Sequence, residues 1–170
     1  GFPLLGYASS TDCTELVRKV LLKLNEISYE TIRFSYIHRR IPDQGVVSLG
    51  IMGGMTSLMG AMIASNQDIV SLLLECGADP FHTTVSGDDA LMFASIFGRT
   101  DNVKFWLDRF PDWDLERRNK VTGSTVLSHA VFFGPRRLEL INELLNRGES
   151  LNYRTDTGGS ILTALCECED

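Results

Sequence analysis

The sequence lacks any run of roughly 18 apolar residues, the length that a membrane-spanning helix needs. Basic residues are also fewer than acidic ones. The chain has 16 Lys and Arg against 22 Asp and Glu, and its net charge of −6 argues against a general affinity for nucleic acid. We therefore expect no membrane span and no nucleic-acid partner.

Cysteine is scarce as well, with four residues in the whole chain. Cys166 and Cys168 lie too close together to bridge comfortably, and no second pair at short spacing accompanies them, as a zinc site requires. We expect free thiols, no metal and no cofactor. Free thiols in turn favour an intracellular, cytoplasmic compartment.

Histidine occurs only three times, as His38, His82 and His129. Among them, His129 directly follows Ser128, and adjacent side chains on a helix diverge. No histidine stands in an arrangement that would activate a nucleophile. We expect no enzymatic activity from these residues.

What the chain does contain is a recurring unit. A glycine is followed four residues later by a leucine, and usually three residues after that by an alanine. The leucines of successive units are separated by 53, 33, 36 and 35 residues. A period of about 33 residues is typical of a stack of similar modules. The five copies are Gly1/Leu5/Ala8, Gly54/Leu58/Ala61, Gly87/Leu91/Ala94, Gly123/Leu127/Ala130 and Gly158/Leu162.

The clearest unit, residues 54–80, predicts a helix, a turn and a second helix. Apolar residues at helical spacing follow Gly54, and the polar run 65–68 then turns the chain. A second apolar helix follows this turn. It ends at Gly77, a residue suited to the left-handed conformation that closes helices. Neither helix is long enough to be stable alone in water.

These residues carry a resemblance. GMTSLMGAMIASNQDIVSLLLECGADP, residues 54–80, resembles an ankyrin repeat, whose pattern is G-x-T-P-L-H-x-A-A-x-x-G-x-x-E-I-V-x-x-L-L-x-x-G-A-D. The resemblance implies an all-α, ankyrin-like solenoid of helix–turn–helix repeats. We expect one array over residues 1–170, with repeats near 1–28, 54–80, 87–112 and 123–152 and an incomplete one at 158–170. Because the chain starts on a repeat's opening glycine and stops after a first helix, we expect a segment of a longer array.

The copies depart from the pattern where their first helices begin. None keeps the proline or the histidine of T-P-L-H. Their helix starts must therefore rely on the hydroxyl and carboxylate groups of Thr56, Asp89, Thr125 and Ser160.

A long insertion at 29–53 separates the first two copies. Within it Ile32, Phe34 and Tyr36 alternate with polar residues, a pattern that favours an extended strand or hairpin. Such an arm either folds back on its own repeats or reaches a neighbouring molecule.

Two basic segments fall on turns that project as fingers in the ankyrin family. They are His38-Arg39-Arg40, in the insertion, and the run that holds Arg117, Arg118 and Lys120. They are either ordinary solvated loops or contacts for an acidic protein surface. RNA or anionic lipid is a weaker alternative.

An apolar stripe is the second candidate surface. The two positions before the turn glycine are exposed on the concave side of ankyrin-like stacks. In two copies they hold Ile96 and Phe97, and Phe132 and Phe133. Large apolar residues at exposed positions often mark an interaction site. Alternatively, the repeats tilt and bury them.

The resemblance implies a non-enzymatic protein–protein interaction module, which we interpret as an adaptor or scaffold segment of a larger protein. The alternative is a regulatory segment of a multidomain enzyme or channel whose activity lies outside this chain. In either case we expect the helix pairs to stack through Leu58, Leu73, Leu91, Leu107, Leu127 and Leu145.

Overall fold

The structure is a computed structural model that describes residues 5, 8–9, 13–26, 37–38, 53–64, 67–132, 138–154, 158 and 160–166. These residues form eight α-helices, and the β-structure among them is one isolated bridge between Arg154 and Ser160. The expected all-α class is therefore confirmed. The chain divides into two compact units, Gly1–Val85 (unit 1) and Ser86–Asp170 (unit 2).

In unit 1, helix α5 (Gln67–Glu75) packs against both α2 (Thr14–Asn25) and α4 (Ser57–Ala64). The pair α4 and α5 is the helix–turn–helix expected for residues 54–80. Gly77 follows α5 with a φ of 87°. The N–H of the next residue, Ala78, donates to the carbonyl oxygen of Leu73 at 2.9 Å. This arrangement closes the helix as predicted.

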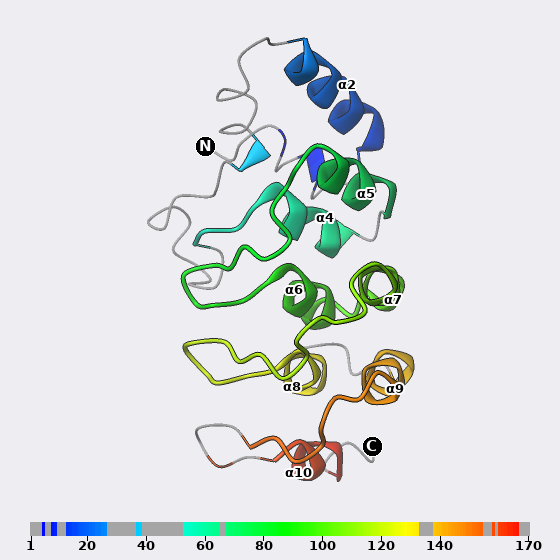
Figure 1. The fold of residues 1–170 in the computed structure, drawn as a ribbon. Helices are drawn as coiled ribbons and strands as arrows, with labels where there is room; N and C mark the ends of the chain where they lie inside the picture. Colours follow the sequence, from blue (N-terminus) through cyan, green and yellow to red (C-terminus); the bar gives the residue numbers. More distant parts are fainter. Residues whose placement is uncertain are drawn as a thin grey trace. The chain divides into compact units, whose positions relative to one another are not determined.

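The described residues of unit 2 form five helices, and Figure 1 shows these helices as two columns. The inner column consists of α6 (Ala90–Ile96), α8 (Val126–Phe132) and α10 (Ile161–Cys166), with α8 packed against both of the others. The outer column consists of α7 (Thr100–Arg109) and α9 (Leu138–Asn146), which pack against each other and against α6 and α8 respectively. Each helix pair thus buries apolar residues that neither helix could shield alone.

The predicted helix starts are confirmed in all four copies. In each, the side-chain oxygen of the first residue of the motif accepts a backbone N–H three residues later, which satisfies a donor that the helix leaves unpaired. The bonds are Thr56 Oγ1 with Met59 at 3.3 Å, Asp89 Oδ1 with Met92 at 2.9 Å, Thr125 Oγ1 with Ser128 at 3.3 Å and Ser160 Oγ with Thr163 at 3.0 Å.

Five of the six leucines expected in the core are buried: Leu58, Leu73, Leu91, Leu107 and Leu127. The sixth prediction is wrong, because Leu145 is only half-buried and the fully buried residue of α9 is Leu144. Leu144 stands four residues before Gly148, as Leu73 does before Gly77. Since adjacent residues on a helix point about 100° apart, only one leucine of such a pair faces the core.

Both tryptophans of the chain lie in unit 2, in one aromatic cluster with Phe110. The ring centroids of Trp106 and Trp113 are 5.2 Å apart in an edge-to-face arrangement. Trp106 is fully buried. Tryptophan fluorescence therefore reports the folding of unit 2 alone.

The alternating segment of the insertion, residues 32–36, lies outside the described residues. Within 29–53 the structure describes residues 37, 38 and 53. Ile37 is buried and His38 is half-buried.

Candidate functional site

Residues 116–122, which we call the finger, lie in the connection between α7 and α8 and turn around Asn119. The side chain of Asn119 is buried, and its Oδ1 accepts the backbone N–H of Val121 at 3.2 Å and that of Thr122 at 2.8 Å. The backbone N–H of Asn119 donates to the carbonyl oxygen of Ser124 at 2.9 Å. The side-chain oxygen thus accepts N–H groups that a backbone carbonyl would otherwise accept, as asparagine side chains commonly do in turns. The tip of the finger is therefore closed around a buried amide.

The finger lies against the turn that precedes α6. The N–H of Lys120 donates to the carbonyl oxygen of Ser86 at 2.7 Å. A β-carbon added at Gly87 would lie 3.0 Å from the Lys120 nitrogen, and the φ of Gly87 is 86°. Both facts favour glycine, which lets the two loops approach. In unit 1, Val85 and Gly53 pair in the same way, N–H to carbonyl oxygen at 3.3 Å.

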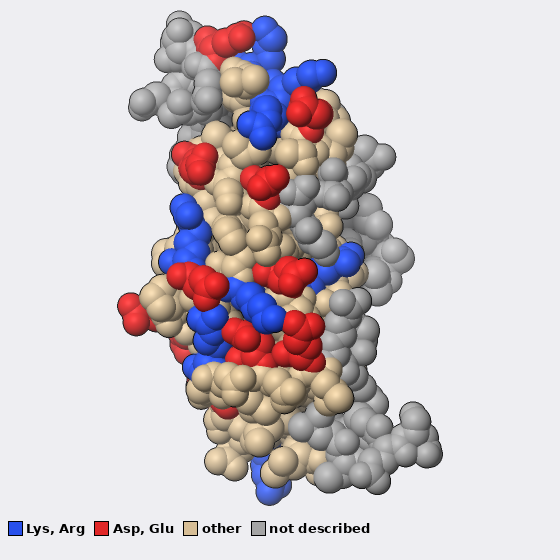
Figure 2. All heavy atoms as spheres, turned by 90° about the vertical axis from the view of Figure 1, so that its right-hand side faces the viewer, with Lys and Arg blue, Asp and Glu red and all other residues tan. Residues whose placement is uncertain are grey.

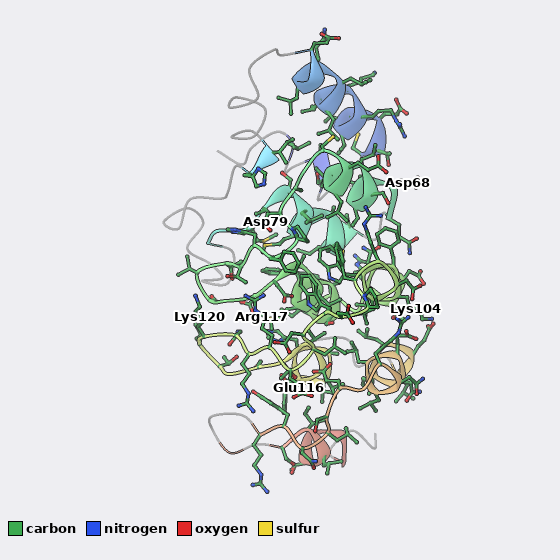
Figure 3. All side chains as sticks on the ribbon, viewed as in Figure 1. Asp68, Asp79, Lys104, Glu116, Arg117 and Lys120 are labelled. Carbon is green, nitrogen blue, oxygen red and sulfur yellow. The ribbon has the colours of Figure 1, made fainter. Side chains whose placement is uncertain are left out.

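The three basic residues of the finger differ in their surroundings. Figure 3 shows Arg117 and Lys120 on the loop side of unit 2. Lys120 and Arg118 are exposed, and the guanidinium of Arg118 stands 4.9 Å from the ring centroid of Tyr153. Arg117 is half-buried, and its charge acts on the buried carboxyl of Asp89. Two cations of the finger are thus exposed, while the third is half-buried.

The other predicted basic segment is described at one position only. His38 is half-buried, and Arg39 and Arg40 lie outside the described residues. The structure therefore gives no geometry for this segment as a surface.

The apolar stripe is partly described. Phe97, the residue after α6, is 39% exposed, while Ile96 and Phe132 are half-buried. Phe133 lies outside the described residues. Phe97 is thus the member of the stripe whose ring is open to solvent.

Behind the finger lies a cluster of buried polar side chains that the sequence analysis did not single out. His129 Nε2 is 3.2 Å from Oδ1 of Asp88, and Nδ1 is 2.8 Å from the carbonyl oxygen of Thr125. Asn119 Nδ2 donates to the same Asp88 oxygen at 2.9 Å. The buried amide of Asn119 is therefore hydrogen-bonded to an Asp88 carboxyl that also contacts His129.

Glu149 is the second buried acid and is 5% exposed. Its Oε1 accepts the backbone N–H of Leu127, in the first turn of α8, at 2.8 Å. Burial raises the pKa of this carboxyl from 4.5 to about 7, although the hydrogen bonds from the Leu127 N–H and with the Thr125 side chain oppose the shift. The negative charge of Glu116 raises the pKa further, and His129 acts against it.

Asp89 is the third buried acid. Burial raises its pKa above the usual value of 3.8. The bond from the N–H of Met92, the charge of Arg117 and a weaker bond from the N–H of Leu91 oppose this shift. Asp89 Oδ2 and Glu149 Oε2 are both buried and have no hydrogen-bond partner among the described residues. A protonated carboxyl costs less in such a position than an ionised one.

The sequence did carry a signal for Glu149. In the clearest repeat the residue after Gly77 is Ala78, which is small and buried. The corresponding residue after Gly148 is Glu149. A glutamate in place of a buried alanine is the kind of departure that marks a special position.

The outer helices of unit 2 carry a different surface. Figure 2 shows basic and acidic side chains interspersed on this face. Lys104 Nζ and Glu139 Oε1 are 2.6 Å apart, which links α7 to α9. Arg147, the residue after α9, pairs with Asp108 on α7 and with Glu143 on α9, at 2.5 and 2.9 Å. These exposed pairs satisfy one another and leave little net charge for a partner.

Within the described part of the chain, no three His, Cys, Asp or Glu side chains are grouped so that they could hold a metal ion. The side chains of Cys166 and Cys168 lie outside that part. None of the described helices is long and apolar enough to cross a membrane.

A family model described as ankyrin repeats matches residues 58–155 in three copies, which is more than half of the chain. The match covers α4 to α9, the finger and the buried acids. Ankyrin repeats are in general non-catalytic modules for protein–protein interaction. With its helix pairs, its repeat period and this match, the chain belongs to the ankyrin repeat family.

Proposed function

We propose that this chain is a non-enzymatic recognition segment, an adaptor or scaffold part of a larger protein, and that the finger of unit 2 binds an acidic segment of a protein partner. The observation that carries the proposal is the difference in exposure among neighbouring side chains of the finger. Arg118 and Lys120 face solvent, whereas Asn119 between them is buried and holds the tip closed. A preorganised loop loses little conformational entropy when it binds.

The tip also offers an apolar contact. Val121, between Lys120 and Thr122, is 69% exposed. A segment that combines carboxylates with one apolar side chain would match this sequence of groups. The charges would speed association, and the apolar contact would favour retention.

The apolar stripe supplies a second contact in this proposal. Phe97 is its exposed ring, with Ile96 and Phe132 half-buried. Aromatic anchors tend to dominate the energy of interfaces. A partner that also covers Phe97 would gain more than the finger alone provides.

A protein partner accounts for the charges better than a nucleic acid does. The chain as a whole carries a net charge of −6, so an extended polyanion would meet a net repulsion. A short acidic segment needs only that local patch. We place the interaction inside the cell, where thiols such as that of Cys13, which is exposed, stay reduced.

The test is affinity capture with three forms of the chain: wild type, Arg118→Gln/Lys120→Gln, and the control Lys104→Gln/Arg109→Gln. The control removes the same charge from the outer helix α7. We expect a protein that the wild type and the control retain and that the finger variant loses. Equal retention by all three forms would contradict the role of the finger.

A further inference from the structure

Unit 2 buries three acids and one histidine. Asp89 among them caps α6, but capping does not require that the carboxyl be buried. Asp88, Asp89, His129 and Glu149 are each 5% exposed or less. At the position of Glu149, the clearest repeat of unit 1 has the small and buried Ala78. Ionisable groups this deep in a protein are costly unless they are paired or neutral.

We propose that the stability of unit 2 responds to protons. The buried carboxyls of Glu149 and Asp89 take up protons as the unit folds, so the folded unit is more stable at mildly acidic pH than at alkaline pH. The geometry supports this directly. Glu149 Oε2 and Asp89 Oδ2 are buried and have no hydrogen-bond partner among the described residues, so a proton removes an unsatisfied charge at each.

The charged groups around the two acids come from several elements. Asp88 precedes α6, Glu116 and Arg117 belong to the finger, and His129 lies on α8. Arg117 and His129 favour ionisation of Asp89, and Glu116 opposes ionisation of Glu149. The charged residues of α9 are Glu139 and Glu143, and α10 carries none within 161–166.

The sign of the pH dependence follows from the direction of the shifts. The folded unit holds the Glu149 proton with a pKa of about 7, against an ordinary value of 4.5. A raised pKa contributes stability that is complete below the unfolded value and is lost as the pH rises through the folded one. The stability that the Glu149 proton contributes is therefore lost between pH 4.5 and about 7. The raised pKa of Asp89 acts in the same direction.

The finger is attached to this cluster at two points. Glu116 Oε1 accepts the N–H of Ser150, the residue next to Glu149, at 2.8 Å. Asn119 donates to Asp88, which contacts His129. Loosening of the cluster would therefore release the finger as well. That this would regulate partner binding rests on the function proposed above, whereas the proton response itself does not.

The experiment is urea unfolding of the whole chain, followed by tryptophan fluorescence at about pH 5.5 and about pH 8. We expect the ratio of folded to unfolded unit 2 to be on the order of tenfold higher at the acidic pH. Glu149→Gln keeps the shape and the acceptor for Leu127 but cannot titrate, so most of the difference should disappear. Glu139→Gln removes an exposed carboxylate of the same unit, and this variant should show the same difference between the two pH values as the wild type.

Equal or greater stability of the wild type at about pH 8 would overturn the proposal. So would an undiminished pH dependence in Glu149→Gln. If that variant does not fold, Glu149→Ala, which restores the residue found at position 78, takes its place under the same criteria. Hydrogen exchange of the Val121 and Thr122 amides at both pH values tests the link to the finger. Protection unchanged while stability shifts would refute that link, and none of these measurements needs a partner.

Discussion

Phe97 donates its backbone N–H to the carbonyl oxygen of Phe93 at 3.1 Å, yet the two rings have opposite environments. Phe93 is 1% exposed, and Phe97, one helical turn later, is 39% exposed. Phe93 lies within α6, whereas Phe97 is the residue after its last turn, where the helix no longer holds the side chain on its buried face. The pair makes a matched comparison of a core and a surface phenylalanine.

Replacing Phe97 with serine should leave unit 2 folded, with a loss of about 1 kcal/mol or less in the free energy of unfolding. Phe93→Ser should cost at least the 3–5 kcal/mol typical of truncating a buried phenylalanine. Circular dichroism and urea unfolding measure both. With a captured partner in hand, Phe97→Ser should weaken binding by about 2 kcal/mol or more, the threshold of a hot spot. Lost helicity in Phe97→Ser at moderate temperature would make Phe97 a core residue and remove it from the proposed interface.

The repeat register makes a second prediction. Leu91 and Leu127 are fully buried in α6 and α8, so replacing either with alanine should cost roughly 2–5 kcal/mol. Leu162 on α10 is 51% exposed and serves as the control, with an expected change of about 0.5 kcal/mol or less. Tryptophan fluorescence during urea unfolding measures all three. A loss below about 1 kcal/mol at both buried leucines would contradict the register.

A third prediction concerns two glycines of unit 2 that share a left-handed backbone. Gly87 and Gly148 have φ values of 86° and 98°. A β-carbon at Gly148 would meet nothing within 4 Å, whereas one at Gly87 would press on the backbone of Lys120. Gly148→Ala should therefore cost about 1–2 kcal/mol for the backbone conformation alone. Gly87→Ala should cost about 1–3 kcal/mol more, since the finger must also move.

Thermal or urea unfolding of the two variants checks this difference, and exchange of the Lys120 amide reports the finger itself. If both alanine variants lose the same stability and the Lys120 amide stays protected, the close approach of the two loops does not constrain the finger.

The sequence by itself determined the features that depend on local order along the chain. The period of the leucines predicted the helix pairs, and the motif Thr-x-Leu or Asp-x-Leu predicted the caps at Thr56, Asp89 and Thr125. Capping and helical spacing are properties of a few neighbouring residues, so a single sequence is enough to recognise them.

Only the tertiary structure decided which side chains face the core where the local pattern allows two choices. The leucine pair at the end of α9 is one such case, in which Leu144 is buried and Leu145 is not. The buried cluster is another, because Asp88, Asn119 and His129 are far apart in the chain and meet only when the finger packs beside α6 and α8. Whether a polar side chain is buried, and what its pKa becomes, depends on neighbours that the stacking of repeats brings together. For Glu149 that neighbour is the first turn of α8, 22 residues away along the chain.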